Sequence, residues 1–235
     1  MTLIRNIAFV HIPKAGGTSV RGFIAGHVDP LDIFPEGRLH HFPRFDSLAV
    51  ERPMLFMSHL GFDFVRRAQA DAFVLMRHPV ERLLSLYSYA MHPGKNVPII
   101  GKHVVEGMTL ADFLTSDRPE ITMNTDNAQV WQIASGYSER HRKLRLGNGA
   151  TMERITKQAL KNLDDCAVLG VLEDIDAFYG RISAYFVEDK PREGPGQRNA
   201  SEKRLRWADL TPAEKVLLES RVTEEWVLYE RAKAG

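Results

Sequence analysis

The segment at residues 11–19 contains the residue types that bind a phosphate or sulfate group. It joins an apolar run, expected to be a strand, to apolar residues at helical spacing. Amide N–H groups at a helix start attract anions, glycines let the backbone approach a ligand closely, and a lysine adds a mobile cation. The hydroxyl groups at the end of the segment add donors. Its candidate ligand-binding residues are Lys14, Ala15, Gly16, Gly17, Thr18 and Ser19.

Two other interpretations of this segment stay open. A glycine-containing turn with a surface lysine is an ordinary connection between a strand and a helix. A Walker A loop has the order G-x-x-x-x-G-K-[ST], whereas Lys14 here precedes both glycines. No apolar run is followed by an acidic residue clearly placed to hold magnesium. The sequence therefore disfavours an ATP- and magnesium-dependent nucleotide or small-molecule kinase, which remains the alternative enzyme class.

A second candidate anion-binding group follows the apolar run at 72–76. Arg77 comes at the expected carboxyl end of this strand, and Pro79 suits the first turn of a helix. A guanidinium forms paired hydrogen bonds with phosphate oxygens, and Ser85, eight residues later, can donate one more. The alternative for Arg77 is a salt bridge at the strand end, and Ser85 alone is an ordinary helix serine.

Residues 9–19 strongly resemble the 5′-phosphosulfate loop of carbohydrate sulfotransferases, which use 3′-phosphoadenosine 5′-phosphosulfate (PAPS). Residues 74–85 resemble the 3′-phosphate segment of the same family, in which an arginine and a serine hold that phosphate. Arg77 and Ser85 occupy those positions, about sixty residues after the first motif. The likeness is to the heparan/dermatan two-O-sulfotransferase branch, which acts on sugar polymers. His78 stands where the family has Asp or Asn, which puts local helix capping in doubt.

Weaker similarity continues at 126–129, at 170–173 and over 199–229, so the resemblance covers most of the chain. It implies PAPS as the co-substrate. Because a transferred sulfuryl group carries less charge than a phosphoryl group, we expect no requirement for a metal ion. The resemblance also implies a basic flap over the nucleotide between 190 and 206. The expected contacts from this flap are Arg198, Asn199 and Ser201. The Asn-Ala-Ser sequence there also fits a glycosylation sequon, which we interpret as accidental.

Sulfuryl transfer to a hydroxyl needs a base for the acceptor proton and a cation at the leaving phosphate. Lys14 is the expected leaving-group stabiliser. His59 is the expected base, because it follows an apolar strand and so lies at the sheet edge where ligands bind. The His59 segment also resembles the one that supplies the base in the two-O-sulfotransferase branch. The alternative is a structural histidine that caps the strand.

Other titratable residues compete for roles near the site. His11 precedes the loop and is expected at most to line the pocket, and Glu81 is the acidic rival for the base. Three further histidines lie in expected loops and are candidates for acceptor contacts: His40, His41 and His92. The cationic run at 140–145 is either a solvated face or part of an acceptor site.

The order of expected elements alternates strands and helices, which predicts an α/β fold with a mainly parallel sheet. The expected strands are 7–10, 54–57, 72–76 and 166–172. The expected helices begin near residue 17 and after Pro79, and continue at 109–116, 124–136, 151–163, 174–185 and 211–232. We predict one sulfotransferase-like domain over 1–235, with a P-loop-like three-layer arrangement in which helices flank the central sheet.

Composition limits the remaining classes. A chain of 235 residues with 44% hydrophobic residues suits one folded domain, and a net charge of +1 argues against a general nucleic-acid-binding protein. The single cysteine, Cys166, excludes an intramolecular disulfide and indicates a buried structural thiol. No run is long and apolar enough to span a membrane. The first expected strand begins near Met1, so we expect a cytoplasmic protein without a signal peptide.

The sequence therefore predicts a PAPS-dependent O-sulfotransferase whose acceptor is a carbohydrate or another hydroxyl compound. A non-catalytic relative that binds glycans is the second alternative. The joint presence of Lys14, His59, Arg77 and Ser85 argues against it. The acceptor and the oligomeric state are not encoded in any motif that we recognise.

Overall fold

The computed structural model describes residues 3–35, 52–92, 100, 102–136, 142–143, 146–186 and 205–235. Its centre is a four-stranded, all-parallel sheet in the order β2-β1-β3-β4. The strands are β1 (Ile7–Val10), β2 (Leu55–Ser58), β3 (Asp71–Met76) and β4 (Val168–Val171). The α/β class, the parallel sheet and all four expected strand positions are confirmed.

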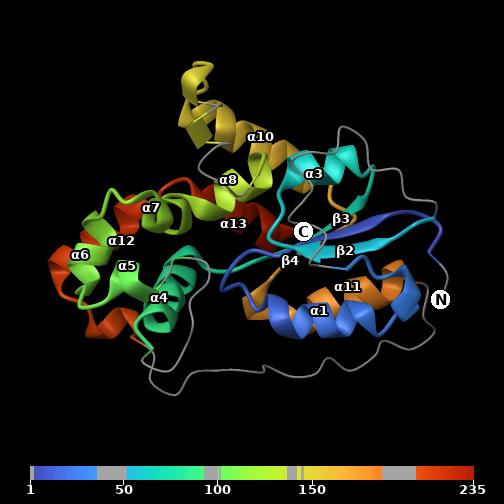
Figure 1. Cartoon of the computed structure of the whole chain (residues 1–235), viewed down its shortest axis with the longest axis horizontal. Helices are drawn as coiled ribbons and strands as arrows, with labels where there is room; N and C mark the ends of the chain where they lie inside the picture. The colour runs from blue at the N-terminus through green and yellow to red at the C-terminus, as the bar shows by residue number, and fades with distance from the viewer. Residues whose placement is uncertain are drawn as a thin grey trace.

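Helices cover both faces of the sheet and form a three-layer fold (Figure 1). Helices α1 (Gly17–Ala25) and α11 (Ile175–Tyr185) pack on one face, on side chains such as Phe9 and Phe73. The other face, which includes Val10 and Val74, is covered by α3 (Phe62–Arg67), α8 (Ala128–Ala134), α10 (Met152–Asp164) and α13 (Glu225–Ala234). Burial on both faces explains why the strands are continuous apolar runs.

A separate group of helices packs beside the sheet, at the left of Figure 1. It consists of α4 (Pro79–Ala90), α5 (Lys102–Val105), α6 (Leu110–Thr115), α7 (Pro119–Thr125) and α12 (Pro212–Arg221). Three short 3₁₀ turns complete the described elements: Pro30–Asp32, Leu172–Asp174 and Trp207–Asp209. In the described part of the chain, no helix combines the length and the apolar character that crossing a membrane requires.

The strand order has a topological switch point between β1 and β3. From β1 the chain continues to β2 at one edge of the sheet, whereas from β3 it continues to β4 at the opposite edge. Where neighbouring parallel strands connect in opposite directions, their carboxyl ends diverge into a ligand-binding crevice. The loop after β1 and the residues after β3 flank this position. These are the two segments that carry the expected anion-binding residues.

Two expected helices are each broken into two. The helix expected at 124–136 is interrupted at Asn127, which has a φ of 46°. The Asn127 N–H donates to the Arg221 carbonyl (2.7 Å), and its side-chain oxygen accepts from the Glu224 N–H (2.9 Å). The helix expected at 211–232 is α12 followed by α13. Backbone groups at one break form hydrogen bonds with groups at the other break. No local sequence pattern predicts bonds over such a separation.

Candidate functional site

The loop between β1 and α1 has the backbone form of an anion-binding turn. Lys14 and Gly16 both have left-handed backbone angles, with φ of 68° and 78°. Gly16 is the N-terminal cap of α1, and no side chain caps this helix start. Because the first turn of a helix leaves its N–H groups without intrahelical acceptors, these groups can receive an anion.

His11 explains why glycine is required at position 17. A Cβ atom on Gly17 would lie 2.0 Å from His11 Nε2, so the imidazole ring packs directly against the glycine. At Gly16 a Cβ atom would approach the Leu172 side chain to 2.5 Å. The two glycines therefore allow the loop to pack on its neighbours as well as to turn.

His59 lies beside His11 at the carboxyl end of the neighbouring strand. The β1–β2 register pairs Val10 with Ser58, so the next residues of both strands are neighbours. The two imidazole rings stack with centroids 4.2 Å apart. His59 Nδ1 lies 2.8 Å from the His11 carbonyl oxygen, and since a carbonyl only accepts, Nδ1 carries the proton. In the neutral form of His59 the lone pair is therefore on Nε2, as a general base requires.

His11 is neutral under ordinary conditions. Burial, with the nearby His59, Arg21 and Lys14, lowers the pKa of His11 to about 3. Its Nδ1 atom has no hydrogen-bond partner among the described residues. A neutral ring is the form that stacks on His59 without charge repulsion. His11 is thus a structural neighbour of the expected base, in agreement with the minor role that its sequence position indicates.

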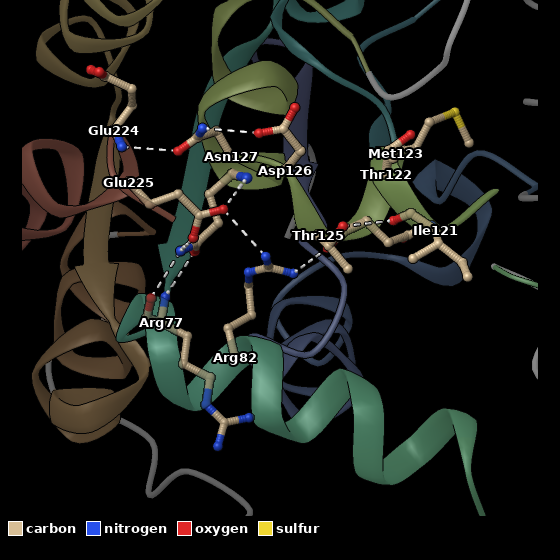
Figure 2. Close-up of polar contacts among 12 residues, drawn as sticks. Arg77, Arg82, Ile121, Thr122, Met123, Thr125, Asp126, Asn127, Glu224 and Glu225 are labelled. Carbon is tan, nitrogen blue, oxygen red and sulfur yellow. Dashed lines mark hydrogen bonds and ion pairs between the residues drawn. The ribbon is translucent and has the colours of Figure 1, made fainter. Parts of the chain in front are cut away.

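Arg77 connects the two expected anion-binding segments. It follows β3 directly and is 7% exposed. Its Nη1 atom donates to the Lys14 carbonyl oxygen (2.8 Å), although the two residues lie 63 positions apart. Figure 2 shows the Arg77 side chain directed away from the buried carboxylate of Glu225, whereas Arg82 is directed toward it. The guanidinium of Arg77 therefore lies at the loop.

Ser85 lies on the face of α4 that turns toward the same loop. The Lys14 ammonium group lies 4.0 Å from the centre of the Tyr89 ring, which is a cation–π contact. Ser85 is four residues before Tyr89, so both side chains project from one face of the helix. Ser85 is half-buried. The structure thus brings Lys14 and Arg77 into contact and places Ser85 on the adjoining helix face.

A buried polar cluster behind Arg77 has no counterpart among the expected site residues. The Gln129 side chain accepts from the Arg77 N–H (3.1 Å), and its amide nitrogen donates to the Arg77 carbonyl (3.0 Å). The same nitrogen donates to Glu225 (2.7 Å), and Glu225 pairs with Arg82 at 3.2 Å. Arg82 and Glu225 are at most 1% exposed. Arg82, Gln129 and Glu225 fall within the segments of resemblance at 74–85, 126–129 and 199–229, but the sequence assigned no role to any of the three.

His78 does not cap α4 with its side chain, as its departure from the family pattern indicates. Its backbone N–H donates instead to Glu173 (3.1 Å), which also accepts from the Tyr229 hydroxyl (3.4 Å). The His78 ring packs edge-on against Trp226 and Tyr229. Burial lowers the pKa of His78, which favours the neutral ring. The region at 170–173 and the C-terminal helix therefore both support the start of α4.

Several expected contacts lie outside the described residues. Arg198, Asn199 and Ser201 are among them, as are His40 and His41. Of the cationic run at 140–145, Arg142 donates to the carbonyls of Thr122 and Met123 (both 2.9 Å) and lies over the Trp131 ring at 5.2 Å. This arginine closes the end of α7, which is a structural role.

Cys166 lies shortly before β4 and is not part of the candidate site. Burial raises the pKa of its thiol to about 12, and the thiol donates to the Asn162 carbonyl (3.3 Å). The residue is half-buried, not fully buried as expected, and its hydrogen-bonded thiol with a raised pKa fits a structural role. The described residues contain no group of three or more His, Cys, Asp or Glu side chains placed to share a metal ion.

Comparison with known proteins adds no family assignment to this geometry. No protein-family model matches the chain, and no curated protein matches its sequence.

Proposed function

We propose that this protein is an O-sulfotransferase that moves a sulfuryl group from PAPS to a hydroxyl group, with a carbohydrate as the acceptor class. The observation that carries the proposal is the hydrogen bond from Arg77 to the carbonyl of Lys14. It joins two cationic residues at a switch point of the sheet, where a ligand with two separate anionic groups fits. The resemblance at 9–19 and 74–85 supplies the identity of that ligand.

PAPS supplies an activated sulfuryl group and leaves as the 3′,5′-bisphosphate. In the proposed reaction, the acceptor oxygen forms a bond to sulfur while the bond from sulfur to the 5′-phosphate oxygen breaks. His59 Nε2 takes the acceptor proton, because its Nδ1 already donates to the His11 carbonyl. The Lys14 ammonium group stabilises the negative charge that develops on the leaving phosphate oxygen.

Arg77 and Ser85 hold the 3′-phosphate in this proposal. A guanidinium presents several donors in one plane, so it can keep its bond to Lys14 and still donate to phosphate oxygens. The arginine therefore orders the loop and binds the nucleotide at the same time. The basic flap residues Arg198, Asn199 and Ser201 belong to the proposal through the resemblance alone.

The direct test combines nucleotide binding with sulfate transfer. Isothermal titration with 3′-phosphoadenosine 5′-phosphate and with adenosine 5′-phosphate measures the contribution of the 3′-phosphate, and the first should bind more tightly. Transfer of radiolabelled sulfate from PAPS to a panel of polysaccharides, glycolipids and small alcohols then measures turnover. We expect His59→Ala to lose turnover by about 10²–10⁴-fold while it keeps nucleotide affinity.

Four results would contradict the proposal. Equal affinity for the two nucleotides would remove the 3′-phosphate site. A near-normal rate of His59→Ala at every pH would remove the base. Tight binding of ATP with magnesium, together with phosphate transfer, would favour the kinase alternative, and nucleotide binding without transfer to any acceptor would favour a non-catalytic relative.

A further inference from the structure

We propose that two buried glutamines of α8 are positioning residues that act on the two halves of the site separately. Gln129 positions Arg77 for the 3′-phosphate, and Gln132 positions His59 for proton transfer. The inference rests on the proposed sulfotransferase function and gives these residues roles that the resemblance does not supply. Neither glutamine side chain is exposed to solvent.

Gln129 holds the backbone of Arg77 on both sides. Its side-chain oxygen accepts from the Arg77 N–H (3.1 Å), and its nitrogen donates to the Arg77 carbonyl (3.0 Å). Glu225 fixes the glutamine in turn, because its carboxylate accepts from both the side chain (2.7 Å) and the backbone N–H (3.0 Å) of Gln129. These bonds set the direction in which the residue after β3 presents its side chain.

The negative charge of Glu225, which holds Gln129, is neutralised by an ion pair with a buried arginine. The carboxylate pairs with Arg82 (Figure 2). The Arg82 guanidinium also donates to the Asn124 carbonyl (3.1 Å). A buried charge that is paired and hydrogen-bonded holds its neighbours rigidly, because any displacement leaves a buried polar group unsatisfied. The clamp on Arg77 is therefore stiff, and the guanidinium of Arg77 is directed away from it.

Gln132 performs the corresponding task for His59. Its amide nitrogen donates to the carbonyls of His11 and Leu60 (both 3.0 Å). The His11 carbonyl is the group that accepts from His59 Nδ1, and Leu60 is the next residue after His59. One side chain therefore holds the acceptor of the His59 proton and the backbone that carries the imidazole. This arrangement orients the ring and fixes its tautomer.

The two glutamines lie one helical turn apart, yet their bonds reach different strands. Gln129 contacts the residue that follows β3, whereas Gln132 contacts residues that follow β1 and β2. Each can therefore be removed without deleting a bond made by the other. This geometry predicts separable effects, which loss of general stability would not produce.

The experiment compares Gln129→Met with Gln132→Met, each the matched control of the other. Both variants remove a buried amide of one helix and keep a side chain of similar length. Gln129→Met should lower the affinity for 3′-phosphoadenosine 5′-phosphate by about tenfold or more, and leave the affinity for adenosine 5′-phosphate unchanged. Gln132→Met should leave both affinities unchanged and lower kcat by about tenfold to a hundredfold.

A spectroscopic measurement tests Gln132 without turnover. In protein labelled at the histidine nitrogens, NMR should show wild-type His59 with its proton on Nδ1. Gln132→Met should show both tautomers in exchange, while Gln129→Met keeps the wild-type signal. Circular dichroism verifies folding, and Gln129→Asn and Gln132→Asn replace any Met variant that unfolds. These shorter amides should show a smaller defect in the same parameter.

The outcomes separate this inference from the proposed function. If the wild-type protein showed no preference for the nucleotide with the 3′-phosphate, the proposed function would be overturned. The His59 tautomer in wild type and Gln132→Met would still show whether Gln132 positions this ring. Wild-type preference together with unchanged affinity in the folded Gln129 variants would overturn the role of Gln129 alone. If both glutamine variants lost affinity and kcat in equal proportion, α8 would be only structural and the inference would be wrong.

Discussion

Arg77 Nη1 donates a hydrogen bond of 2.8 Å to the carbonyl oxygen of Lys14, across 63 residues of chain. This bond links the loop after β1 to the end of β3. The carbonyl of Lys14, a residue with a left-handed backbone, therefore holds the Arg77 guanidinium, and the two cationic residues lie together. Substitutions can remove the contribution of each of these residues separately.

Lys14→Ala should lower turnover by about 10²–10³-fold and leave the fold intact, because in the proposed reaction the ammonium group stabilises charge that develops on the leaving oxygen. The backbone of this residue has a φ of 68°, which alanine and lysine tolerate equally poorly. The change therefore isolates the side chain. Lys157→Ala, which removes an exposed lysine of α10, is the control and should keep the full rate. Sulfate transfer from PAPS measures both.

Arg77→Ala should abolish the difference in affinity between 3′-phosphoadenosine 5′-phosphate and adenosine 5′-phosphate. Arg77→Lys should restore only part of it, since an ammonium group lacks the planar fork and cannot hold the Lys14 carbonyl and a phosphate in the same way. Calorimetric titration measures these affinities. A lysine variant with wild-type preference would show that charge alone is required at this position.

Gly17→Ala should disrupt the site, because the added Cβ would lie 2.0 Å from His11 Nε2 and displace a ring that stacks on His59. Nucleotide affinity and turnover should both fall. Gly22→Ala is the matched control within α1, since a Cβ there has no neighbour within 4 Å. That variant should keep activity and raise the free energy of unfolding by about 0.5–1 kcal/mol. Loss of activity in Gly22→Ala would argue against this explanation.

His11 should make the protein less stable in acid. Its folded-state pKa is about 3, below the ordinary value of 6.5, so the unfolded chain binds the extra proton between these values. The stability contributed by neutral His11 is complete above the unfolded pKa and is lost as the pH falls toward the folded pKa. This single group lowers the free energy of unfolding by up to about 1.4 kcal/mol per pH unit in that window.

The measurement for His11 is denaturant unfolding of wild type and His11→Asn at several pH values. The stability of the wild type relative to the variant should decline from about pH 6 to about pH 4, because asparagine does not titrate. A constant difference between the two proteins over this range would contradict the lowered pKa.

Glu225→Ala should destabilise the protein by about 3–5 kcal/mol, because it leaves the guanidinium of Arg82 buried without its counter-charge. Glu153→Ala breaks an exposed ion pair with Lys157 and is the control, with little change expected. Thermal and denaturant unfolding measure both variants. Equal stabilities of the two variants would show that the buried pair contributes nothing to the fold.

Sequence patterns alone determined the parallel sheet and the two motifs at its edge. Buried strands are continuous apolar runs, and the residues that follow parallel strands meet at one edge, so the positions of Lys14, His59 and Arg77 in the chain suffice to assign them to that edge. Such inferences succeed because local periodicity and chain direction depend on neighbouring residues. The same reasoning predicted a structural Cys166 thiol, and in the structure this half-buried thiol donates to the Asn162 carbonyl.

Only the tertiary structure decided how these residues are oriented. The break at Asn127 depends on bonds to Arg221 and Glu224, about a hundred residues away. The glutamines of α8 are ordinary helix residues in the sequence, yet they hold Arg77 and the carbonyl that accepts from His59. Hydrogen bonds over such separations depend on how helices and strands pack, and no periodic pattern of residues in the sequence specifies these contacts. The candidate anion-binding residues could therefore be identified from the sequence, but the groups that position them could not.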